Sequence, residues 1–396
     1  MSDTVARAVD AAFRQDWGRV VAAVIETTGD WDLAEDSAQE AFAAAVPAWR
    51  RDGVPDSPRA WLTTTARNRA IDRIRRAQVG AAKLREIAEE RMASLEVDLD
   101  ALDSGIGDER LRLLYTCCHP ALSLESRVTL ALRTLCGLST AQIARAFLVP
   151  EATMAKRLVR TKRKITVAGI PFRVPPARLL PERTSAVLAT VYLLFHEGYA
   201  AGRAELRSHA RTLAGLTADL MPDHPEAAGL HALLLLLDGR SAARIGDDGA
   251  LVPLDEQDRV RWDTAMIGEG LATVRRALRR GHPGPYQVQA LIAACHVLPE
   301  TDRGRIAALY DRLLALVPSD TVRLNRAIAI AMRDGPDLAL LDGIGEHPLL
   351  PATRADFLRR LGRDTEAAEQ YRLALDATDH EAEKAYLRRR LREVGG

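Results

Sequence analysis

Seven basic residues and one acidic residue lie within residues 139–166, whose sequence is STAQIARAFLVPEATMAKRLVRTKRKIT. Guanidinium and ammonium groups in such excess bind phosphate, and the same groups can donate hydrogen bonds to base edges. At about 100° per helical residue, Lys156, Arg160 and Arg163 share one face. The pattern therefore predicts a DNA-binding surface. The alternative is an ordinary helical hairpin with a solvated charged face.

Two helices and a tight turn are expected to position these basic side chains. Ser139 suits the N-cap of a short first helix in which Ile143 and Ala144 face inward. Leu148-Val149-Pro150 breaks this helix, and Pro150 suits the first turn of a second one. The second helix has an apolar stripe formed by Met154, Leu158 and Ile165. This arrangement is typical of a helix-turn-helix that enters a major groove.

A second basic helix is expected to begin at Ser57-Pro58, an N-cap followed by a proline at the first helical position. Residues 59–76 hold six basic residues and one acidic residue. The expected inward face comprises Leu62, Ala66, Ala70 and Ile74. The outward face comprises Trp61, Thr64, Asn68 and Arg75. These side chains can stack on a displaced base, bond its edge and bind phosphate. Packing of Trp61 against preceding helices is the alternative.

Residues 32–49 predict an amphipathic helix upstream of this basic helix. Asp36, Gln39 and Glu40 are available there to a partner. A merely solvated acidic face is the commoner meaning of such a pattern.

Charge is distributed very unevenly along the 396 residues, although the net charge is only +1. Residues 111–176 hold 11 basic and 2 acidic residues, a net charge of +9. Residues 80–110 hold 4 basic and 9 acidic residues, a net charge of −5, and are interpreted as an acidic linker. The neutral total is therefore a cancellation and does not exclude a nucleic-acid partner.

The composition and the hydrophobic periodicity exclude several classes of protein. Helix formers dominate and no sustained period-2 pattern occurs, so we expect an all-α protein. No signal peptide or membrane span is expected, and four cysteines indicate a reducing cytoplasm rather than a disulfide framework. Cys117-Cys118-His119 has no second ligand pair, so we expect buried thiols, no metal and no cofactor. We find no pattern of an enzyme active site.

Taken together, the segments resemble the extracytoplasmic-function (ECF) sigma factors of the sigma-70 family over roughly residues 10–166. AEDSAQEAF followed by W resembles the helix of sigma domain 2 that binds core RNA polymerase. WLTTTARNRAIDRIRR resembles the adjoining helix that melts and recognises the −10 element. LSTAQIARAFLVPEATMAKRLVRTKRKI resembles the helix-turn-helix of domain 4 that recognises the −35 element. The resemblance implies core polymerase and promoter DNA as partners, and no covalent chemistry.

The resemblance also implies roles for individual residues. Core polymerase would be bound by Asp36, Gln39, Glu40 and Phe42. The −10 region would be bound by Arg50, Arg51, Trp61, Asn68, Arg69, Arg73, Arg75 and Arg76, with the loop Arg50 to Ser57 capturing a flipped base. The −35 region would be bound by Thr153, Lys156, Arg157, Arg160, Lys162 and Arg163. Ala155 departs from the usual basic residue, because a methyl group can contact thymine but cannot hydrogen-bond to guanine.

About 220 residues follow, and they resemble the tetratricopeptide-like extension of one sigma subgroup. Gly362, Ala367, Tyr371 and Ala374 follow that repeat's spacing. The expected domains are 1–79 (domain 2), 80–110 (acidic linker), 111–168 (domain 4), 169–183 (Pro-rich linker) and 184–396 (helical extension). The extension is expected to contact the sigma domains or another protein, inhibiting or assisting them. Two rivals remain: a helix-turn-helix regulator that does not join polymerase, and a repeat scaffold.

Overall fold

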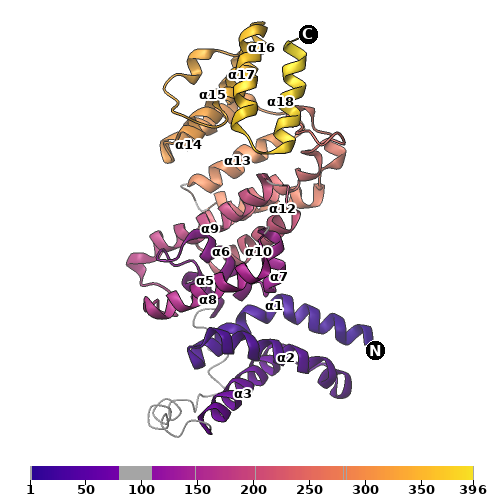
Figure 1. Ribbon diagram of the computed structural model, residues 1–396, viewed down its shortest axis with the longest axis vertical. Coiled ribbons are helices and arrows are strands. Elements are labelled where there is room, and N and C mark those ends of the chain that lie inside the picture. The colour runs from indigo at the N-terminus through magenta and orange to yellow at the C-terminus, as the bar shows by residue number, and fades with distance from the viewer. Residues whose placement is uncertain are drawn as a thin grey trace. The chain divides into compact units, whose positions relative to one another are not determined.

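The computed structural model describes residues 2–79, 109–147, 149–200, 202–279, 281 and 283–395. These residues form α-helices joined by turns and short 3-10 segments, and none of them lies in a β-strand (Figure 1). The all-α prediction is confirmed. The chain divides into two compact units, Met1–Leu194 and Phe195–Gly396, and α9 (Leu180–Ala200) crosses the division. The expected acidic linker lies, except for its last two residues, outside the described residues.

The first three helices form one module, here called the amino-terminal module. They are α1 (Ser2–Thr28), α2 (Trp31–Asp52) and α3 (Pro58–Val79). Each packs on the other two around fully buried Trp17, Trp49 and Leu62. Asp30 caps α2 by accepting hydrogen bonds from the amides of Asp32 (2.9 Å) and Leu33 (3.0 Å), which fixes the corner between α1 and α2.

Four helices form a second module, here called the basic module. They are α5 (Glu109–Cys117), α6 (Leu124–Thr134), α7 (Thr140–Ala146) and α8 (Glu151–Val167). Ser139 caps α7 as expected: its hydroxyl accepts from the Gln142 amide (3.1 Å), and its own amide donates to the Gln142 side chain (2.8 Å). Ile143 and Ala144 are buried, so the predicted helix-turn-helix is present.

The Pro-rich segment after α8 packs against the basic module. The Thr116 hydroxyl donates to the carbonyl of Pro171 (3.3 Å), and the Tyr115 hydroxyl lies 2.8 Å from that of Thr184. Arg183 donates to the Tyr115 carbonyl at 3.1 Å. The helix α9 already begins at Leu180, and the first compact unit reaches Leu194.

The second unit is a succession of helices that pack mainly on their neighbours in sequence. They are α10 (Ala204–Leu220), α11 (Pro225–Asp238), α12 (Thr264–Leu278), α13 (Pro285–Val297), α14 (Arg303–Leu316), α15 (Asp320–Asp334), α16 (Leu350–Arg360), α17 (Asp364–Ala377) and α18 (Glu381–Val394). Ala367, Tyr371 and Ala374 are buried in one core cluster, as the repeat spacing predicts. Gly362 turns the chain between α16 and α17 with φ +74°.

Among the described residues, no helix is both long enough and apolar enough to cross a membrane.

Candidate nucleic-acid interface

The outward face of α8 carries a row of exposed polar and basic side chains. Thr153, Lys156, Arg160 and Arg163 are all exposed. The opposite stripe is buried and comprises Met154, Leu158 and Ile165, with exposed fractions of 0%, 5% and 4%. The predicted division into a packing face and a basic face is confirmed. An exposed basic face on the second helix of a helix-turn-helix can contact both phosphates and bases.

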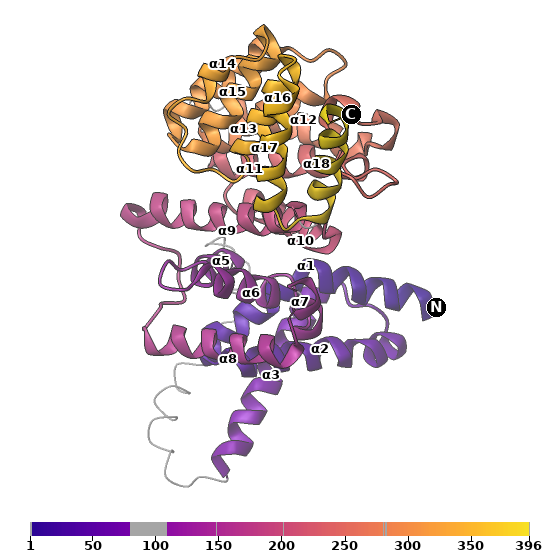
Figure 2. The ribbon, with the colours of Figure 1, turned by 45° about the horizontal axis from the view of Figure 1, so that its top comes forward.

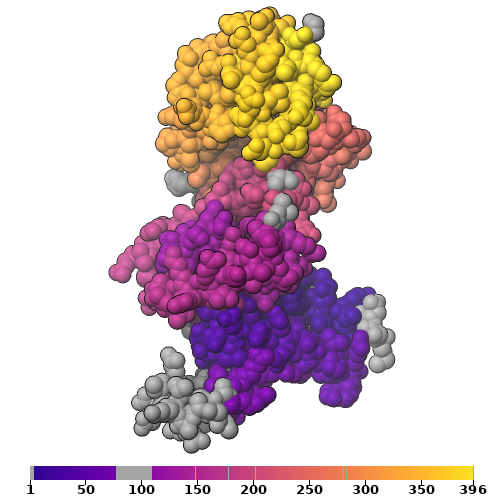
Figure 3. All heavy atoms as spheres, in the orientation of Figure 1, coloured from indigo at the N-terminus to yellow at the C-terminus, as the bar shows by residue number. Residues whose placement is uncertain are grey.

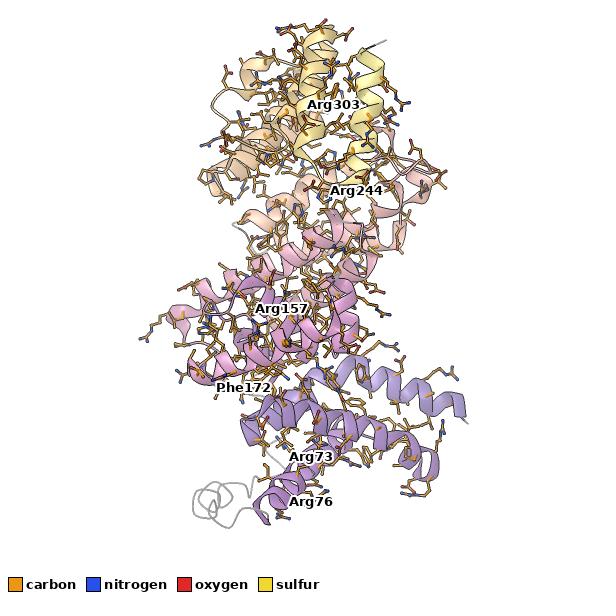
Figure 4. The ribbon with its side chains drawn as sticks, viewed as in Figure 1. Arg73, Arg76, Arg157, Phe172, Arg244 and Arg303 are labelled. Atoms are coloured by element: carbon orange, nitrogen blue, oxygen red, sulfur yellow. The ribbon has the colours of Figure 1, made fainter. Side chains whose placement is uncertain are left out.

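Two of the basic residues predicted to bind DNA from α8 are already paired within the protein. Arg157, labelled in Figure 4, lies 3.2 Å from the Glu125 carboxylate at the start of α6. Lys162 is only 8% exposed, and its Nζ lies 2.7 Å from Oδ1 of Asp32 and 3.0 Å from Oε1 of Glu35. Lys162 therefore faces the amino-terminal module, and its role as a DNA contact stays a prediction.

Glu35 is the centre of this contact between the two modules. It is 3% exposed, and its second oxygen accepts a hydrogen bond from Arg133 of α6 at 2.8 Å. One buried carboxylate thus lies between two cations of the basic module, Lys162 and Arg133. A buried charge is tolerated where it is paired in this way.

Close packing surrounds the buried ion pairs. Trp17 donates through Nε1 to the Arg133 carbonyl at 3.4 Å, and the ring of Phe172 meets that of Trp31 edge-on at 6.3 Å. A pocket of about 370 Å³ lies beside them, lined by residues 28–32 of the α1–α2 corner and by α8. Figure 2 shows α8 alongside the helices of the amino-terminal module, and Figure 3 shows the side chains of the two modules in contact.

The outward face of α3 is only partly as predicted. Thr64, Asn68 and Arg75 are exposed, whereas Trp61 is half-buried and meets Trp49 edge-on at 5.7 Å. Trp61 therefore packs against a preceding helix, as the alternative predicts, but part of its ring remains accessible, so its role in base stacking stays a prediction. Arg76 is exposed at the end of the same helix (Figure 4).

Two residues implied to bind polymerase and two implied to bind DNA form one ion-pair network on the surface of the amino-terminal module. Arg69 lies 3.0 Å from Glu40, and Arg73 lies 2.9 Å from Asp36 and also contacts Glu40. All four side chains are at least 37% exposed. Slight burial raises the pKa of Glu40, but the hydrogen bonds and charges of Arg69 and Arg73 outweigh it and lower that pKa.

Phe42 lies in the core and not on a free surface. It is 6% exposed, and its ring lies 5.2 Å from Phe13 and 5.9 Å from Trp17. Its periodicity with buried Ala38 and Ala45 on α2 was a usable signal for this burial. Gln39, in contrast, is exposed and accessible to a partner.

The loop implied to capture a flipped base is shorter than expected. The helix α2 continues through Asp52, so only Gly53 to Ser57 are non-helical. Arg50 and Arg51 are exposed at the end of α2, and Arg51 makes a two-pronged contact with Asp52 in which both hydrogen bonds are 2.8 Å. Their part in DNA binding stays a prediction.

The cysteines offer no reactive thiolate. Cys117 and Cys118 are buried, and burial raises the pKa of Cys117 well above its ordinary value and those of Cys118 and Cys136 to about 12. No group of three or more His, Cys, Asp or Glu residues in the described ranges is placed to hold a metal ion.

Three family models match the chain. Sigma-70 region 2 matches residues 3–79, Sigma-70 region 4 matches residues 112–165, and a family of unknown function (DUF6596) matches residues 183–278. No solved structure matches the chain.

Among curated relatives, an uncharacterized protein of Rhizobium meliloti (strain 1021) is 40% identical over 401 residues, covering 97% of this chain and 95% of that protein. The ECF RNA polymerase sigma factor SigK of Mycobacterium ulcerans is 31% identical over 148 residues, 35% of this chain and 74% of SigK. The probable ECF RNA polymerase sigma factor SigI of Mycobacterium tuberculosis is 29% identical over 171 residues, 43% of this chain and 58% of SigI.

Proposed function

Because the chain belongs to the ECF sigma factors of the sigma-70 family and carries a carboxy-terminal extension, we propose that it binds core RNA polymerase and directs it to promoter DNA. The observation that carries the proposal is the exposed basic face of α8 behind the capped turn at Ser139. The protein does no covalent chemistry of its own. It acts in the cytoplasm, where polymerase and promoter meet.

In this proposal the two modules bind different parts of the promoter. The face of α8 with Thr153, Lys156 and Arg160 enters the major groove of the −35 element. The face of α3 with Asn68 and Arg75 binds the −10 region, where the accessible part of Trp61 stacks on an unpaired base. Strand separation is stabilised by this capture of unpaired bases, and polymerase supplies the catalytic centre.

Binding both elements requires the modules to separate. Elements about 25 base pairs apart lie about 85 Å apart along B-DNA, at 3.4 Å per base pair. A helix the length of α8, 17 residues, is only about 26 Å long. With Lys162 held against Asp32 and Glu35, one module cannot reach the second element. We therefore include opening of this contact as a step in promoter binding.

The extension is proposed to regulate the sigma modules, either through a contact within the chain or through another protein. Transcription by a variant that lacks residues 195–396 shows whether the extension inhibits or assists the sigma modules. Higher promoter-specific activity than that of the full chain would mean that the extension inhibits. Lower activity would mean that it makes a required contact, and unchanged activity would contradict regulation.

Run-off transcription tests the assignment of α8. Core polymerase and the protein are incubated with templates selected from a library randomised at the −35 and −10 elements. Replacing Lys156 and Arg160 together by alanine should reduce specific transcripts by at least about tenfold, because each base or phosphate contact contributes about 1–3 kcal/mol. Arg372→Ala, which removes an exposed charge from α17, is the matched control. Equal activity of both variants would contradict the assignment.

Zero-length crosslinking tests the opening step. A carbodiimide should join the Lys162 amine to Asp32 or Glu35 in the free protein, because these groups are within 3.0 Å. The crosslinked peptide, measured by mass spectrometry, should decrease several-fold when core polymerase and promoter DNA are added. An unchanged yield in the assembled complex would contradict separation of the modules.

A further inference from the structure

The second unit contains a buried arginine without a counter-ion. Arg240 follows the end of α11 and is 6% exposed. Its Nε donates to the Leu236 carbonyl at 3.3 Å, whereas its buried Nη1 has no hydrogen-bond partner. A guanidinium remains protonated in proteins, so this charge cannot be removed by neutralisation. Burying an unpaired charge costs several kcal/mol.

The carboxylate closest to Arg240 in sequence is already shared by two other arginines. Asp238 lies 2.6 Å from Nε of Arg207 and 2.7 Å from Nε of Arg211, both on α10. Asp238 is itself 8% exposed, so these pairs are largely withdrawn from solvent. One negative charge therefore faces two positive ones before Arg240 is counted.

A fourth guanidinium of this unit, that of Arg244, contacts a tyrosine instead of a carboxylate. Arg244, labelled in Figure 4, donates to the Tyr199 carbonyl at 2.7 Å, and its Cζ lies 4.5 Å from the centre of the Tyr199 ring. In the described part of this unit, neither Arg240 nor Arg244 forms an ion pair with a carboxylate. Arg207 and Arg211 thus share one carboxylate and Arg240 and Arg244 have none among the described residues, so an anion would supply a missing counter-charge.

The groups around Arg240 are neutral hydrogen-bonding side chains and not acids. Burial lowers the pKa of Arg240, and Tyr199 of α9 and Tyr310 of α14 lie close enough to influence that pKa. Burial, followed by the charge of Arg240, lowers the pKa of half-exposed His296 on α13 to about 4. This imidazole is therefore neutral at pH 7. Two phenols and a neutral imidazole can hydrogen-bond to an anion without competing for the guanidinium.

We propose that Arg240 is the centre of an oxyanion-binding site in the extension, which takes the carboxylate or phosphate group of a small ligand. Such groups fit a guanidinium because they accept charge-assisted hydrogen bonds from two of its nitrogens. His296 and Tyr310 are each partly exposed, whereas Arg240 is buried. The site lies outside both DNA-binding modules and does not depend on the proposed function.

Isothermal titration of the full chain with sodium phosphate, and separately with sodium succinate, tests the proposal. Sodium chloride keeps the ionic strength constant, so a general salt effect cancels. One of the two anions should bind, and Arg240→Met should weaken that binding at least about tenfold, the loss of one charge-assisted contact. Binding of phosphate alone or of succinate alone identifies the chemical source of the oxyanion.

Arg275→Met is the matched control. Arg275 also donates through Nε to the carbonyl four residues earlier, Leu271 at 3.0 Å, but it is exposed. This variant should bind the anion as the unchanged protein does. The proposal is overturned if neither anion binds the unchanged protein, or if Arg240→Met and Arg275→Met bind it equally.

Thermal unfolding distinguishes a ligand site from a structural arginine. Without added anion, Arg240→Met should have a Tm no lower than that of the unchanged protein, because it removes an unpaired buried charge. At about one hundred times Kd, the anion should raise the Tm of the unchanged protein by about 5–10 °C. If Arg240→Met unfolds several degrees earlier and the anion leaves the unchanged Tm unaltered, the arginine is structural and the proposal is wrong.

Discussion

Arg73 on α3 and Lys162 on α8 are both implied to bind DNA, and both are paired with carboxylates of α2, but in different surroundings. The Arg73 pairs with Asp36 and Glu40 are exposed, so phosphate can replace the carboxylates at little cost. Lys162 is 8% exposed between Asp32 and Glu35, inside the contact between the modules. The difference indicates that α3 is accessible as it stands, whereas complete access to α8 requires the modules to separate.

The largest expected effect comes from removing the carboxylate of Glu35, which lies inside the contact between the modules. Glu35→Ala leaves buried Lys162 and partly buried Arg133 without their shared carboxylate. We expect the free energy of unfolding of the first unit to fall by about 3–5 kcal/mol, measured by denaturant titration. Glu40→Ala on the exposed side is the control and should cost less than about 1 kcal/mol. Similar losses of unfolding free energy in the two variants would contradict the distinction between buried and exposed ion pairs.

A methyl group at Gly137 tests how closely the modules pack. Gly137 has φ +69°, and an added Cβ would lie 2.8 Å from Phe13 Cζ and 3.0 Å from Trp17 Cδ1 across the contact. Gly137→Ala should therefore destabilise the first unit by about 1–3 kcal/mol, from backbone strain and overpacking. Gly29→Ala, with φ +68° and no atom within 4 Å of the added Cβ, measures the backbone part of this cost. Equal losses would show that the contact tolerates the methyl group.

Lys162→Met asks whether the buried ammonium reaches DNA after separation. If Lys162 binds a phosphate in the open form, the salt dependence of affinity for −35 DNA should weaken by about 0.9 in the log–log slope. Titrations of the full chain at several salt concentrations measure this slope. A slope equal to that of the unchanged protein would restrict Lys162 to the contact between the modules.

The smallest expected effect is at the exposed pairs. The pKa of Glu40 is lowered in the folded protein, so its stabilisation is present above the ordinary value of 4.5 and is lost as the pH falls through the lowered pKa. The free energy of unfolding is measured by denaturation at pH 7 and at pH 3 for the unchanged protein and for Glu40→Gln. The loss between the two pH values should be larger in the unchanged protein, but by less than about 1 kcal/mol. A difference of several kcal/mol between the two proteins would show that Glu40, like Glu35, is a structural carboxylate.

Local features of the fold were predictable because they depend on neighbours in sequence. The Ser139–Gln142 capping box and the buried stripe of α8 both follow from residues three to seven positions apart. The burial of Lys162 was not predictable in this way, because its partner Asp32 lies 130 residues earlier. Phe42 is an intermediate case. The resemblance implied a surface residue that binds polymerase, whereas its spacing on α2 already indicated a core residue.

The central claim is that the chain joins core RNA polymerase, which separates it from a helix-turn-helix regulator and from a repeat scaffold. Equilibrium binding of the full chain to purified core polymerase tests it most directly. We predict a one-to-one complex that is weakened when exposed Gln39 on α2 is replaced by arginine, and is unchanged by Arg372→Ala on α17. No association of the unchanged chain with core polymerase would contradict the account.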